Sequence, residues 1–143
     1  MQNNDFRSAT NPRSLGRSRS DNTFATATNL GNISPNATRV TFSASGSVGK
    51  SDNVDFYKFT LSPGVSLPSG RNSYRLKNGS AILSAYGESQ GTRSFARSLA
   101  LQRGSNLATS SVANPTQFPI TVYFKIEHRS NKTQYNLKFD FFR

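Results

Sequence analysis

Cysteine and tryptophan are absent from this 143-residue chain, and methionine and histidine occur once each. Without cysteine there can be no disulfide, thiolate metal site or cysteine nucleophile. A Ser-His-Asp triad would have to include the single histidine, His128, and the G-x-S-x-G motif of serine hydrolases is missing. Nothing marks Glu88 and Glu127 as a paired acid and base. We therefore expect a protein that is not an enzyme and that has no catalytic residue, metal site or cofactor.

Acidic residues are also scarce. Seven Asp and Glu stand against eighteen Lys and Arg, which gives a net charge of +11 and a pI near 10.8. Such a charge exceeds what solubility requires of a small domain and attracts polyanions. Arginine outnumbers lysine, and guanidinium groups bind carboxylates and phosphates in a bidentate manner. The compatible partners are acidic proteins, nucleic acid and anionic polysaccharide.

Long hydrophobic runs do not occur, so the sequence predicts no membrane insertion. Met1 is followed by Gln-Asn-Asn-Asp and not by the basic and apolar regions of a signal peptide. We expect an intracellular protein or one inside a particle. It would instead be secreted if Met1 is a start codon added to a mature fragment.

Residues 1–20 contain few large apolar side chains and show neither helical nor strand periodicity, so they predict an extended basic arm. Arg7, Arg13, Arg17 and Arg19 oppose a single aspartate there. These four arginines are the predicted partner-binding residues. Their Arg-Ser dipeptides are also compatible with a nucleic-acid arm.

From residue 21 onward, short alternating apolar segments are separated by Gly, Pro, Asn and Ser, which is typical of an all-β domain. The predicted strands are residues 38–48, 54–61, 72–77, 81–86, 95–101, 118–127 and 133–141. Seven to eight such strands indicate an antiparallel, jelly-roll-like β-sandwich over residues 21–143. Residues 94–102 fit neither the strand period nor the helix period cleanly, and a helical turn is an alternative to a strand there.

Details of strand pairing follow from the pattern. Asn78-Gly79 predicts a tight hairpin between two of the strands. The last two strands keep a strict period of two, which predicts neighbouring core strands with Tyr123 and Asp140 pointing outward. An exposed sugar-stacking face made of Tyr74, Tyr86 and Tyr123 is one hypothesis, and packing pairs across strands are the commoner role of such residues.

Four short motifs occur in order: Asp21-Asn-Thr-Phe-Ala-Thr-Ala-Thr-Asn-Leu-Gly31, Gly46-Ser-Val48, Asp52-Asn-Val-Asp-Phe-Tyr-Lys-Phe59 and Tyr135-Asn-Leu137. Together they resemble the bacterial pre-peptidase C-terminal domain, over residues 21–140. The resemblance implies a non-catalytic, jelly-roll-like sandwich that is often attached to secreted hydrolases and that also occurs as free-standing cyanobacterial copies.

The resemblance also suggests calcium binding as a hypothesis. Some relatives bind calcium through acidic residues at positions that match Asp21, Asp52 and Asp55. Calcium takes six to eight oxygen ligands with several carboxylates, and this chain has few acids and no D-x-D-x-D-G loop. We expect these aspartates to cap turns or anchor strands.

Three functional hypotheses remain. The first is a structural interaction protein that docks its sandwich and its basic arm on an acidic protein surface in a larger assembly, by analogy with phycobilisome linkers or phage decoration proteins. The second is a secreted accessory module that binds polysaccharide or a protein polymer for a hydrolase. The third is nucleic-acid binding through the arm.

Overall fold

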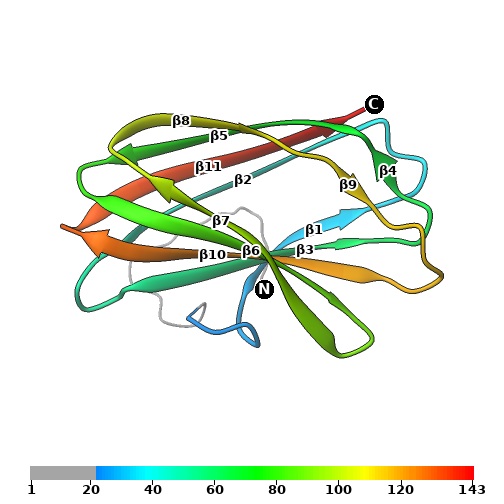
Figure 1. Cartoon of the computed structure of the whole chain (residues 1–143), viewed down its shortest axis with the longest axis horizontal. Coiled ribbons are helices and arrows are strands. Elements are labelled where there is room, and N and C mark those ends of the chain that lie inside the picture. The colour runs from blue at the N-terminus through cyan, green and yellow to red at the C-terminus, as the bar shows by residue number, and fades with distance from the viewer. Residues whose placement is uncertain (1–21) are drawn as a thin grey trace.

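The computed structural model describes residues 22–143, which form two β-sheets packed face to face (Figure 1). This part of the chain contains no helix, and therefore none that could cross a membrane. The strands are β1 (Thr28–Ile33), β2 (Arg39–Val48), β3 (Val54–Leu61), β4 (Ser66–Leu67), β5 (Ser69–Lys77), β6 (Ser80–Ser89), β7 (Thr92–Leu101), β8 (Gly104–Thr109), β9 (Val112–Ala113), β10 (Ile120–Ser130) and β11 (Thr133–Phe142).

The strand order is that of a jelly roll. The four-stranded sheet has the order β2-β11-β5-β8, and β3-β10-β6-β7 form most of the five-stranded sheet. Apart from the β6–β7 hairpin, successive strands of this set alternate between the two sheets. β1 adds to β3 as a parallel edge strand, and β4 and β9 form a separate two-stranded ribbon. The predicted all-β sandwich is confirmed.

The core lies between the two sheets and is rich in aromatic rings. Phe124 of β10 stacks on Phe139 of β11 with ring centroids 4.3 Å apart, and Phe42 stacks on Phe59 at 4.9 Å. Such pairs add about 0.5–1.5 kcal/mol each to the stabilisation from area burial. The strict alternation of β11 directs Tyr135, Leu137, Phe139 and Phe141 into this core.

Two expectations about strand pairing are wrong. β10 and β11 are core strands, but they lie in opposite sheets and meet through their side chains, not through backbone hydrogen bonds. Asn78 and Gly79 do make a tight turn with φ of 67° and 65°, yet this turn carries the chain from β5 in one sheet to β6 in the other. A period of two shows that each strand has an apolar face, but it cannot show whether two such faces lie side by side or opposite each other.

The ambiguous segment 94–102 belongs to strand β7 and contains a β-bulge. Arg97 pairs with Ala85 whereas Phe95 pairs with Tyr86, so Ala96 is the extra residue. A bulge reverses the side-chain alternation, and this places Phe95 on the outer face of the sheet while Arg97, Leu99 and Leu101 face inward. The sequence alternates on either side of the bulge but not across it, which explains the mixed periodicity.

Candidate functional site

The predicted site residues fall in different parts of the molecule. Arg7, Arg13, Arg17 and Arg19, as well as Asp21, lie outside the described residues. Asp52 lies in the β2–β3 loop, where its carbonyl oxygen accepts a hydrogen bond from the Gly49 N–H at 2.9 Å. Asp55 lies inside the sandwich and is 5% exposed. The candidate sites described below are therefore formed by residues of the sandwich.

Three of the four sequence motifs meet in one buried polar cluster. The Tyr135 hydroxyl donates a hydrogen bond to Asp55, and it lies 2.7 Å from the Tyr57 hydroxyl. Gly46 pairs with Tyr135 in the neighbouring strand, and a Cβ at Gly46 would stand 2.7 Å from the Tyr135 hydroxyl oxygen. Only glycine leaves room for the cluster. These motif residues therefore connect the five-stranded sheet to the four-stranded sheet.

Electrostatics keep the Tyr135 hydroxyl protonated. Burial raises the pKa of Tyr135 well above its usual value, and the neighbouring Tyr57 and Asp55 raise it further. A phenol that holds its proton is a permanent donor to the buried carboxylate. Asp55 thus anchors a strand, and in the part of the chain that the structure describes no three His, Asp or Glu side chains gather as metal ligands.

The three tyrosines of the sugar-stacking hypothesis do not share a face. Tyr74 points into the core, where its ring lies 5.7 Å from that of Phe139. Tyr86 and Tyr123 lie on the outer face of the five-stranded sheet, and Phe24 packs edge-on against both rings. Residues before β1 thus cover Tyr123, which is only 8% exposed.

A basic surface occupies the outer face of the four-stranded sheet. In β5 the buried residues alternate with outward-facing Arg71, Arg75 and Lys77, and Lys138 of β11 lies on the same face. The positions between and beside them are mostly serine, threonine and amide side chains. We call Arg71, Arg75, Lys77 and Lys138 with this polar surround the basic face.

One carboxylate lies on the basic face, and it is already neutralised. Asp140 accepts hydrogen bonds from Arg39 Nε at 3.1 Å and Arg39 Nη2 at 2.8 Å, and from the Thr41 hydroxyl at 3.0 Å. Hydrogen bonding from Arg39 lowers the pKa of Asp140. Within residues 22–143, none of the four cations of the basic face has a carboxylate oxygen within 4.0 Å. No carboxylate of the described residues therefore pairs with these four side chains.

The opposite outer face is built differently. On the five-stranded sheet, Glu88 lies 3.7 Å from Arg93, and Glu127 lies 3.6 Å from Lys125. The Arg93 guanidinium also stacks on Phe24 at 3.8 Å from the ring centroid. Positive charge there is largely paired and lies beside a packed aromatic cluster. The two sides of the sandwich thus differ in charge, and the basic face is the stronger candidate for an interface.

The net charge is evident from the sequence, but the basic face is not. Arg71, Arg75 and Lys77 alternate with apolar or buried residues in one segment, and this alternation is the signal that could have marked an outward basic row. Lys138 joins them only because β11 pairs with β5. Comparison of the chain with protein-family models and with curated proteins found no match.

Proposed function

We propose that this protein is a non-enzymatic binding module that docks its basic face on an acidic protein surface within a larger assembly. The observation that carries the proposal is the set of four cations on one sheet face that have no carboxylate partner among the described residues. The basic arm at residues 1–20, with Arg7, Arg13, Arg17 and Arg19, supplies further positive charge to the same kind of partner. Membership of the pre-peptidase C-terminal family is part of this proposal and rests on the motifs alone.

The sheet holds its cations in a preorganised array. Alternate residues of a strand are roughly 7 Å apart, and neighbouring strands are about 4.8 Å apart. Arg75 and Lys77 are separated by one such step, and Lys138 lies on the adjacent strand. Because the backbone is fixed, binding orders only the side-chain ends, and this lowers the entropic cost of association.

The chemistry of the basic face favours carboxylates over nucleic acid bases. Proteins that bind single strands stack bases on exposed aromatic rings. Phe142 is the aromatic residue of this face, and it lies between Arg39 and Arg71, whose guanidinium carbons are 5.9 Å and 5.8 Å from the ring centroid. Because two cations lie over this ring, it is not free to stack on a base. The guanidinium groups can bind carboxylates in a bidentate manner, as they also can phosphates.

The test compares two double variants of equal charge. Arg71→Gln with Arg75→Gln alters the basic face, and Lys50→Gln with Arg103→Gln removes the same charge from exposed loops. Binding of fluorescent poly-L-glutamate is measured by anisotropy between 25 mM and 200 mM salt. The first variant should bind roughly five- to tenfold more weakly at low salt, and the second less than about twofold, because close charge pairs are lost only in the first.

Three outcomes would contradict the proposal. The first is an equal loss in both double variants, which would mean that net charge alone drives binding. The second is tighter binding of a single-stranded oligonucleotide with a steep salt dependence, which would favour the nucleic-acid hypothesis. The third is binding of a neutral glycan that survives high salt, which would favour the secreted accessory module.

A further inference from the structure

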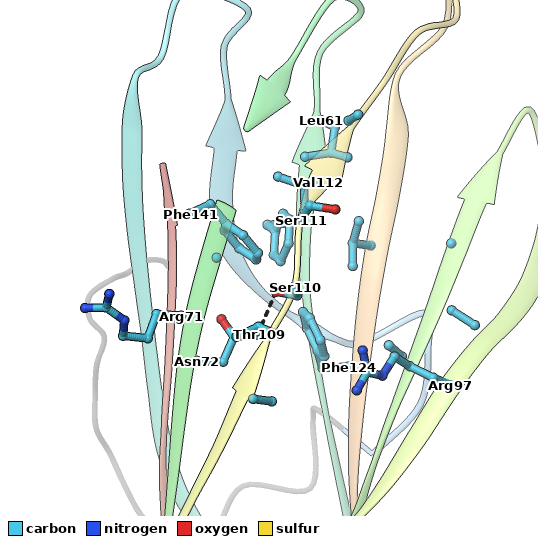
Figure 2. A pocket seen from close by; sticks show the side chains of 18 of the residues that line it. Leu61, Arg71, Asn72, Arg97, Thr109, Ser110, Ser111, Val112, Phe124 and Phe141 are labelled. Atoms are coloured by element: carbon cyan, nitrogen blue, oxygen red, sulfur yellow. Dashed lines mark hydrogen bonds between the residues drawn. The ribbon is translucent and has the colours of Figure 1, made fainter. Parts of the chain in front are cut away.

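The sandwich is open along the side where β7 and β8, the last strands of the two sheets, face each other. A groove of about 890 Å³ enters the core there (Figure 2). Its floor consists of Phe59, Phe124 and Phe141, which belong to the main core. Inward-facing residues along its walls are only partly buried, although a closed sandwich would cover them: Ala85, Leu99, Ala108, Val112, Ile120 and Val122.

Arg97 brings a positive charge to this apolar groove. The bulge at Ala96 turns its side chain inward, and Figure 2 shows the guanidinium of Arg97 pointing from β7 toward the groove. Arg97 has no carboxylate within 4.0 Å in the described part of the chain. An unpaired cation at the edge of an apolar groove is complementary to the acidic group of an amphiphile.

Asn72 adds an unsatisfied polar atom on the facing wall. Its side chain is 4% exposed, and its Nδ2 donates a hydrogen bond to the Ser110 hydroxyl at 2.8 Å (Figure 2). Its Oδ1 is buried and has no hydrogen-bond partner among residues 22–143. Burial raises the pKa of the Tyr74 hydroxyl in this groove, and the Asn72 side chain and the charge of Arg97 oppose that rise. A buried acceptor without a donor destabilises the protein, and a ligand that supplies a donor relieves this.

We propose that this groove binds a small amphiphilic acid that carries a hydrogen-bond donor next to its acidic group, such as an acylated amino acid. The apolar chain lies on the phenylalanine floor, the carboxylate pairs with Arg97, and the donor satisfies Asn72 Oδ1. The size, the largely apolar lining and the few convergent polar groups are those of small-molecule sites. The groove shares Arg71 and Phe142 with the basic face, whereas Arg75, Lys77 and Lys138 do not line it.

Isothermal titration calorimetry with N-dodecanoylglycine, below its critical micelle concentration, tests the proposal. We expect saturable binding of one molecule per chain. Dodecanoate, which lacks the amide donor, should bind about three- to tenfold more weakly, and dodecyltrimethylammonium should not bind. Arg97→Gln should lower the affinity about tenfold, and Arg103→Gln, which removes the same charge from an exposed turn, less than about twofold.

Three further variants complete the test. Ala108→Phe fills the groove and should abolish binding, whereas Ser105→Phe on the outer side of the same strand should leave it intact. Asn72→Leu should remove the preference for N-dodecanoylglycine over dodecanoate, with thermal unfolding as the check that it folds. The proposal fails if several molecules bind per chain or if Ala108→Phe binds normally. It also fails if Arg97→Gln self-associates while keeping full affinity, since Arg97 would then serve to protect an edge strand.

Discussion

The substitution Tyr135→Phe tests whether the buried polar cluster stabilises the sandwich. It removes one hydroxyl and leaves the ring, which lies 6.4 Å from that of Tyr57. The hydroxyl is fully buried and donates to Asp55, so its loss takes a donor from a carboxylate that is 5% exposed. Hydrogen bonds to charged groups contribute about 1.5–3 kcal/mol, and we expect the free energy of unfolding to fall by that amount.

Urea denaturation followed by circular dichroism measures this change, and thermal unfolding should show a midpoint lower by roughly 5–15 °C. Tyr86→Phe is the matched control, because Tyr86 is partly exposed and its hydroxyl makes no hydrogen bond within residues 22–143. The control should change stability by less than about 0.5 kcal/mol. If Tyr135→Phe behaves like the control, the cluster does not hold the two sheets together.

Two further predictions concern the outer faces. Because Arg39 lowers the pKa of Asp140, the stability from this carboxylate is present above its unfolded pKa of about 3.9 and is lost as the pH falls through the lower folded value. Asp140→Asn should flatten the pH dependence of the unfolding midpoint below about pH 4, and an unchanged profile would contradict this. Phe24→Ala should destabilise the protein by roughly 1.5–3 kcal/mol in urea, since it uncovers Phe56 and Tyr123, and an unchanged urea midpoint would show that Phe24 does not protect the sheet.

The two outer faces of the sandwich and its open edge differ in the side chains that they present. Residues 22–27 close the outer face of the five-stranded sheet with an aromatic cluster. On the four-stranded sheet no carboxylate of the described residues pairs with the cations of the basic face, and the open edge between β7 and β8 exposes part of the core. A partner on the basic face would contact β5 and β11, and Arg71 of β5 also lines the groove.

The fold class was predictable from local patterns. Period-two alternation in residues 38–48, 54–61 and 133–141 marks strands with one apolar face, and all seven predicted strands occur. Four strands were missed: β1, β4, β8 and β9. β4 and β9 have two residues each, and β1 and β8 are strands with few large apolar residues at sheet edges, so no periodic signal identifies them.

By itself the sequence determined the all-β class, the strong positive charge and the absence of cysteine chemistry, because each depends on composition or on neighbouring residues. Tertiary structure alone decided which strands lie side by side and that Arg71, Arg75 and Lys77 share a face with Lys138. It alone also decided that Arg97 turns inward at a bulge. The reason is that sheet pairing joins residues far apart in the chain, and one added residue in one strand exchanges the inner and outer faces beyond it.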